Sequence, residues 1–313
     1  MQIPDRRTFE ALSVEAAAAR GPLERAWARA WRNASVRIGG AAFLALVAVA
    51  IAAPWLGTVD PTLFDAASRD LAPGAVGEIT TLEGERRPHR FLMGSDSLGR
   101  DIYSRVLYGT RVSLVVGVAV ALLSLGAGVA AGLAAGYVRW LDGPLMRLMD
   151  GVMAIPAILI AIALVALWGA SLATVIVALA VPEVPRVARL VRAMVLTIRE
   201  EPYVEAAIAL GTPTPRILLG HVLPNTIAPL IVQGTFICAS AILLEAILSF
   251  LGVGLPPDIP TWGNIMAEGR VQFVQHPHNI FFPGLFLTAT VLAVNILGDG
   301  LRDTLDPKMA RRA

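Results

Sequence analysis

The residues of this chain that could carry chemistry are few and widely spaced. Glu245 is the only charged residue in the stretch 227–251. A carboxylate at membrane depth is costly, so it should face other helices or a water-filled path. Structural pairing and a place in a translocation path both remain open for Glu245. Proton coupling finds no second titratable group in the same stretch.

Two polar clusters resemble metal or catalytic sites at first sight. Asp96, Arg100 and Asp101 lie close together, but an Asp-x-x-Gly turn and opposite charges favour a charge-paired external loop. His276 and His278 flank a proline and could ligate a metal. Neither a carboxylate nor a cysteine lies near them in sequence, so a surface loop is favoured. No metal site is therefore predicted.

The motifs of an ATP-hydrolysing enzyme are missing from the sequence. A P-loop needs a lysine directly after a glycine-rich turn, and the only lysine, Lys308, follows Pro307. Cys238 is the only cysteine, which excludes an intramolecular disulfide. We therefore expect no enzymatic activity and no cofactor bound to this chain.

The elements that position these residues are predicted to be membrane helices. Of the 313 residues, 56% are hydrophobic and only 16% are charged, whereas soluble domains carry about 25% charged residues. Seven arginines precede residue 38, which places the N-terminal tail, residues 1–35, in the cytoplasm. Within it, Glu15–Trp31 is either a surface helix or a loosely ordered tail. The net charge of +2 calls for no nucleic-acid partner.

The apolar stretches predict an all-α integral membrane protein with six spans and both termini cytoplasmic. The first span is residues 36–59, and an external segment, 60–108, precedes a transmembrane core at 109–304. Gly128, Gly132 and Gly136 lie on one face of the second span and favour close packing inside the bundle. The other expected segments are spans at 112–138, 145–167, 172 onward, 227–251 and 279–298, an external loop at 252–278, and a cytoplasmic tail at 305–313.

A polar segment at 200–225 interrupts the apolar spans with strong helix punctuation. The sequence predicts a helix from Pro202 to Leu210 that ends at Gly211, a C′ residue. Thr212 should cap a second helix, with Pro213 at its first position. That helix should end before Pro224, because a proline ring disfavours helical geometry at the residue before it. Asn225 and Thr226 should then cap the next apolar helix.

The residue order of this segment resembles the EAA loop of ATP-binding-cassette (ABC) importer permeases. Glu205-Ala206-Ala207 is followed after three residues by Gly211, and His221-Val222-Leu223-Pro224 comes nine residues later. His221 stands where the general pattern has isoleucine, as is usual in the peptide-importer branch. Residues 89–114 and 248–269 also resemble the C-type permeases of dipeptide, oligopeptide and nickel importers.

The resemblance implies a type I, MetI-like permease fold in a bacterial inner membrane. It implies that the 200–225 loop couples to a separate ATPase through seven residues: Glu205, Ala206, Ala207, Gly211, His221, Leu223 and Pro224. It further implies a second homologous permease subunit, two ATPase subunits that bind ATP and Mg, and an external solute-binding protein. The solute would be a di- or oligopeptide, with nickel, glutathione or opines as alternatives.

Two other classes of function remain as rivals. An ion-driven secondary transporter or channel would work without an ATPase and depend on Glu245. A membrane-bound scaffold would not transport at all.

Overall fold

Long apolar helices form most of the protein, whose computed structural model describes residues 30–81 and 84–305. Four of the helices are long and apolar enough to cross a membrane, and a fifth span results if one bent pair is counted as a single crossing. The four are α3 (Ala34–Ala52, extended by a 3-10 turn to Trp55), α4 (Ile102–Tyr137), α11 (Leu223–Phe250) and α13 (His278–Leu305).

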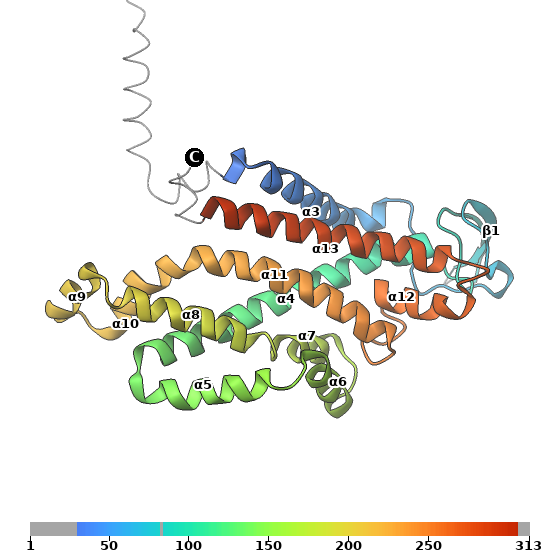
Figure 1. The fold of residues 1–313 in the computed structure, drawn as a ribbon. Coiled ribbons are helices and arrows are strands. Elements are labelled where there is room, and N and C mark those ends of the chain that lie inside the picture. Colours follow the sequence, from blue (N-terminus) through green and yellow to red (C-terminus); the bar gives the residue numbers. More distant parts are fainter. Residues whose placement is uncertain (1–29, 82–83, 306–313) are drawn as a thin grey trace, which may run out of the picture.

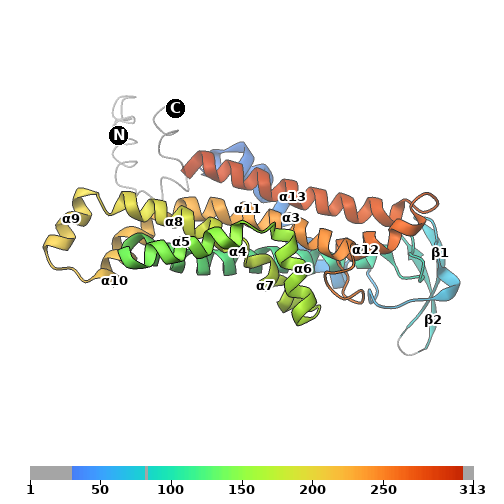
Figure 2. The ribbon, with the colours of Figure 1, turned by 60° about the horizontal axis from the view of Figure 1, so that its bottom comes forward.

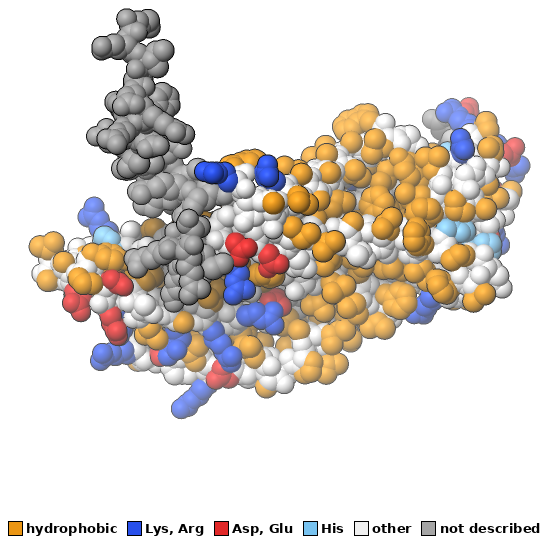
Figure 3. Space-filling view, turned by 45° about the horizontal axis from the view of Figure 1, so that its top comes forward, with side chains coloured by type: hydrophobic (Ala, Val, Ile, Leu, Met, Phe, Trp, Pro, Cys, Tyr) orange, Lys and Arg blue, Asp and Glu red, His pale blue; other side chains and the backbone are white. Residues whose placement is uncertain are grey.

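These helices run along a long molecule with different elements at its two ends (Figures 1 and 2). The short helices α9 and α10 lie at one end, and the strands β1 and β2 lie at the other, with α12 (Trp262–Gly269) nearby. Apolar side chains form a wide band across the face that carries α3 and α13, with charged side chains towards both ends (Figure 3). This pattern is expected for a protein that crosses a bilayer.

Small residues let the long helices approach one another closely. A Cβ added to Gly132 of α4 would lie 2.6 Å from the Ala188 carbonyl oxygen of α8 (Val184–Ile198). A Cβ at Gly136 would come equally close to Val195. Together with Gly128, which meets Val187, these residues confirm that the predicted glycine face packs inside the bundle.

The expected third and fourth spans are not simple rods. The third is divided into α5 (Arg139–Met153) and α6 (Ala157–Trp168), which meet at an angle of 88°. Pro156 lies at the bend, where its ring cannot continue the helix. The fourth begins as α7 (Leu172–Ala180) and breaks over residues 181–183 before α8. The sequence predicts a kink at Pro156 within the span at 145–167, and the structure has a sharp break between two helices at that position.

Two ion pairs fasten α8 to α5. Arg192 donates to Asp142 at 2.6 Å, and Arg189 pairs with Asp150. These contacts join elements about forty to fifty residues apart in sequence, on the side of the bundle away from α3.

The external segment contains structure that the all-helical expectation missed. Strands β1 (Ala75–Thr80) and β2 (Arg86–Phe91) form an antiparallel hairpin. The Thr80 hydroxyl donates to Asp65 at 2.7 Å, and this bond holds the pKa of the Asp65 carboxyl below its ordinary value. The 3-10 turn that Asp65 caps, Ala66–Ser68, is thereby joined to the hairpin.

Several element boundaries also differ from the expected ones. Helix α4 begins at Ile102, inside the segment predicted to be an external loop up to residue 108. Helix α13 continues to Leu305, seven residues beyond the expected end of the sixth span. The helix considered for Glu15–Trp31 and the tail at 305–313 fall almost entirely outside the described residues.

Candidate functional site

The polar connector between α8 and α11, residues 200–225, lies at the end of the molecule opposite the β-hairpin (Figure 1). It consists of α9 (Pro202–Ala209), α10 (Thr214–Ile217) and one π-helical turn (Leu218–Val222) that leads into α11. Val204, Ile217 and Val222 are fully or almost fully buried and anchor the connector to the bundle. Its remaining residues are mostly exposed.

Helix α9 ends at Gly211, as predicted. Gly211 has φ of +76°, its N–H donates to the Ile208 carbonyl at 2.9 Å, and the Thr212 N–H donates to the Ala207 carbonyl at 3.1 Å. These two bonds form a Schellman motif, which satisfies carbonyls at the helix end and requires a left-handed residue. No heavy atom lies within 4 Å of a Cβ built on Gly211, so the backbone angle alone selects glycine here.

The second helix differs from the prediction. Pro213, rather than Thr212, occupies the N-cap of α10. The chain does not leave helical geometry before Pro224, because Leu223 keeps φ of −56° and ψ of −44°. The π turn changes the hydrogen-bond pattern just before the proline, and Pro224 occupies the first turn of α11, where a missing N–H is tolerated. The expected helix end was therefore wrong.

A small polar network closes the connector on itself. The Asn225 side-chain amide donates to the His221 carbonyl at 2.6 Å and to the Tyr203 hydroxyl at 3.2 Å. The rings of Tyr203 and His221 lie 6.1 Å apart. Asn225 thus joins the Tyr203 side chain of α9 to the backbone of the π turn, instead of capping α11 as predicted. Thr226 likewise donates back to the Leu223 carbonyl.

Three large apolar side chains are exposed on the connector. Leu210 is 86% exposed and Leu219 is 63% exposed, with Ile208 also exposed. Exposed side chains of this size, next to the charged Glu205 and Arg216, are typical of a protein contact. Of the other residues implied by the resemblance, Ala206 and Pro224 are exposed, Ala207 is buried, and Leu223 is half-buried.

Glu245 lies far from the connector, near the other end of α11, and is fully buried. Its Oε1 accepts a hydrogen bond from Ser249 at 2.8 Å, and the Ser249 hydroxyl accepts the Leu255 N–H at 3.2 Å. Its Oε2 has no hydrogen-bond partner among the described residues. Glu245 therefore faces the protein interior and lies beside the loop that follows α11.

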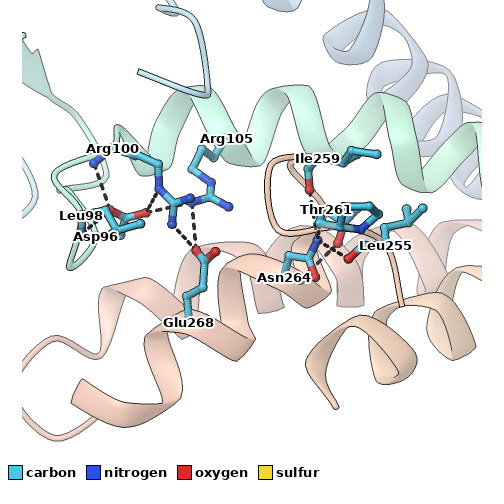
Figure 4. Close-up of polar contacts among 10 residues, drawn as sticks. Asp96, Leu98, Arg100, Arg105, Leu255, Ile259, Thr261, Asn264 and Glu268 are labelled. Carbon is cyan, nitrogen blue, oxygen red and sulfur yellow. Dashed lines mark hydrogen bonds and ion pairs between the residues drawn. The ribbon is translucent and has the colours of Figure 1, made fainter. Parts of the chain in front are cut away.

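Four charged side chains, three of them buried and Glu268 partly exposed, form a cluster that joins α12 to the start of α4 (Figure 4). Asp96 accepts from Arg100 at 2.7 Å and from Arg105 at 2.9 Å. Glu268 of α12 accepts from the same two arginines, at 2.9 Å from Arg105. The turn at Asp96 is present as predicted, with the Leu98 N–H donating to the Asp96 carboxylate. Asp101 lies outside the cluster and caps α4.

Sequence reasoning missed Arg105 and Glu268. They are 163 residues apart, so no local pattern could pair them. Asn264 was also missed, although its side-chain amide lies close to three loop carbonyls, those of Leu255, Pro256 and Ile259 (Figure 4). The loop before α12 is thereby folded onto the helix that follows it.

His276 and His278 pack against each other, with ring centroids 5.8 Å apart. Across the residues that the structure describes, no group of three or more metal-ligating side chains is found.

Comparisons with known proteins identify the family of this chain. Residues 112–311 match the family described as the binding-protein-dependent transport system inner membrane component. A probable peptide ABC transporter permease of Sinorhizobium fredii is 47% identical, over 90% of this chain and 91% of its own. The di/tripeptide permease DppC of Pseudomonas aeruginosa is 40% identical, over 93% and 94%.

A glutathione permease, GsiD of Salmonella paratyphi A, is 41% identical over 93% of this chain and 92% of its own. Among solved structures, the inward-facing MetNI methionine ABC transporter has a chain that superposes with a TM-score of 0.51 at 17% identity, covering 64% of this chain and 95% of that one. This likeness supports the type I permease fold. The chain belongs to the family of inner membrane components of binding-protein-dependent transport systems.

Proposed function

We propose that this chain is the C-type permease subunit of an ABC importer for short peptides. The peptide class is supported by relatives named for peptides and for glutathione, itself a tripeptide. The chain would assemble with a second homologous permease, two ATPase subunits that bind ATP and Mg, and an external solute-binding protein.

The connector is proposed as the contact for the ATPase. The observation that carries this proposal is its exposed apolar tip, Ile208, Leu210 and Leu219, held on a folded element at the end of the bundle. Val204, Ile217 and Val222 anchor the same element in the bundle, so a force applied to the tip would reach α8 and α11. Glu205, which is exposed on α9, would meet a basic group of the ATPase.

Gly211→Val tests this proposal. A β-branched residue at φ of +76° strains the left-handed end of α9, at a cost of about 1–2 kcal/mol or more. In proteoliposomes with the whole complex, we expect ATP-driven peptide uptake to fall at least about tenfold, while the protein still inserts. Uptake and ATP hydrolysis should be measured together, because uncoupling leaves hydrolysis running.

Gly220→Ala provides the matched control. It lies in the same connector, has no positive φ, and a Cβ there meets no heavy atom within 4 Å, so uptake should be unchanged. Full uptake by Gly211→Val would refute the assignment of the connector. Uptake that continues without any ATPase subunit would instead favour an ion-driven transporter.

A further inference from the structure

A cavity of about 670 Å³ lies between α8, α11 and α13, at the half of the bundle nearer the connector. Its volume falls within the range of roughly 300–1,000 Å³ that is usual for small-molecule sites. Leu190 and Met194 of α8, with Phe236 of α11, supply apolar walls. Three polar side chains complete it: Asn225 and Gln233 from α11 and Arg302 from α13.

Pro229 adds a backbone acceptor to this wall. It lies inside α11 and lines the cavity. Because proline has no N–H, the carbonyl of Asn225, four residues earlier, lacks its helical donor. A carbonyl freed in this way within a membrane protein is tolerated where it faces a polar cavity. Both N–H groups of the Asn225 amide already donate within the connector. The site therefore offers one guanidinium, the Gln233 amide, the Asn225 Oδ1 and one free carbonyl.

These groups match the chemistry of a short peptide. A guanidinium binds a carboxylate through two parallel hydrogen bonds. The Gln233 amide can both donate to and accept from peptide groups, and the Asn225 Oδ1 can accept from a peptide N–H. The apolar walls accept peptide side chains without requiring a particular one, because they offer no directional bonds.

We propose that this cavity binds a short peptide through its C-terminal carboxylate, with Arg302 as the carboxylate contact and Asn225 and Gln233 as contacts to the peptide backbone. The proposal rests on the proposed function, since it names a site for the same class of solute. Asn225 also bonds Tyr203 and the His221 carbonyl of the connector. Occupancy of the cavity would therefore bear directly on the network that holds the connector together.

Equilibrium binding of radiolabelled trialanine tests the proposal. The complete transporter, without its solute-binding protein, is placed in nanodiscs of phosphatidylcholine only, so that no anionic lipid competes. We expect saturable binding of one trialanine per copy of this chain. Trialanine amide, which lacks the carboxylate, should compete about tenfold less well or worse.

Three variants assign the contact. Arg302→Gln should weaken binding about tenfold and remove the preference for the free acid. Gln233→Glu, which adds a negative charge beside the carboxylate, should weaken it as well. Asp303→Asn changes the neighbouring exposed residue, which does not line the cavity, and should leave the affinity unchanged.

The outcomes distinguish failure of the peptide site in this cavity from failure of the proposed importer function. If the wild-type complex takes up peptide with ATP but binds no trialanine up to millimolar concentration, the cavity is not a peptide site and another occupant, such as a helix of the second permease, fills it. Binding that is indifferent to both Arg302→Gln and Gln233→Glu also overturns the proposal. Absence of any ATP-driven peptide uptake by the wild-type complex would refute the proposed function itself.

Discussion

Burying the Glu245 carboxyl in a membrane-spanning helix costs free energy. Hydrogen bonds around it offset part of that cost. One carboxyl oxygen accepts from Ser249, and Ser249 in turn accepts from the loop before α12. No arginine or lysine pairs with Glu245 among the described residues. Glu245 is therefore a hydrogen-bonding link between α11 and an external loop. This favours a structural role over a role that requires the ionised carboxylate.

Glu245→Gln separates these two roles. The amide oxygen can still accept from Ser249, so ATP-driven uptake should stay within about twofold of wild type. Ser249→Ala removes the same bond without changing the carboxyl and should lower stability by about 1 kcal/mol, seen as a lower melting temperature. Loss of uptake in Glu245→Gln alone would show that the ionisable group is needed and would favour an ion-coupled mechanism.

At this scale, some local signals were read correctly, whereas the expected caps at Thr212 and Asn225 were wrong and distant contacts were not predicted. The end of α9 at Gly211 and the turn at Asp96 follow from residue types within a few positions of each other. Arg105 and Glu268 become partners only because α4 and α12 pack together, and a single sequence does not contain that contact. The cluster could therefore be predicted as a charged loop but not as a buried link between elements.

The link between α4 and α12 should be sensitive to the loss of one charge. Arg105 is 1% exposed, so Glu268→Gln leaves two buried arginines beside a single carboxylate. We expect a loss of about 3–5 kcal/mol in stability, measured by thermal unfolding of the detergent-solubilised complex. Glu85→Gln, in a surface pair with Arg87, should change stability by less than about 1 kcal/mol. Equal effects would contradict the buried pairing.

The packing of α4 against α8 depends on glycine. Gly132→Ala would place a methyl group 2.6 Å from Ala188 and Val191, and forcing the helices apart should cost about 1–3 kcal/mol. Gly126→Ala is the matched control on the same helix, because its Cβ would meet nothing within 4 Å. Unfolding midpoints of both variants check the expectation, and equal midpoints would refute it.

Element types were predicted better than element boundaries. The composition of 60–108 gave no alternating apolar pattern, so the hairpin, whose second strand Arg86–Phe91 is mostly polar, left no signal. Pro156 predicted a kink, but its angle depends on how α6 packs against α7. Pro224 predicted a helix end, yet a π turn kept the helix continuous, and no residue pattern marks such a turn.

The proposed orientation of the molecule in the membrane can be tested by labelling cysteines from each side. Cys238 is the only cysteine and is buried, so a Cys238→Ser background allows single-site labelling. Leu219→Cys in the connector should react with an impermeant maleimide only from the cytoplasmic side. Val274→Cys, 91% exposed near the hairpin end, should react only from outside. Labelling of both residues from one side would refute the proposed orientation.

One continuous rod spans the molecule from the connector to the loop that Glu245 and Ser249 hold. Residues Thr214–Phe250 form a helical run of 37 residues, which at 1.5 Å per residue is about 55 Å long. The π turn and Pro229 both lie near its connector end, and helices bend at such positions. The unbroken stretch beyond Pro229 is therefore the part that can tilt as one lever. In the proposed orientation, a displacement of the connector would then move the external loop that follows α11, without a separate relay.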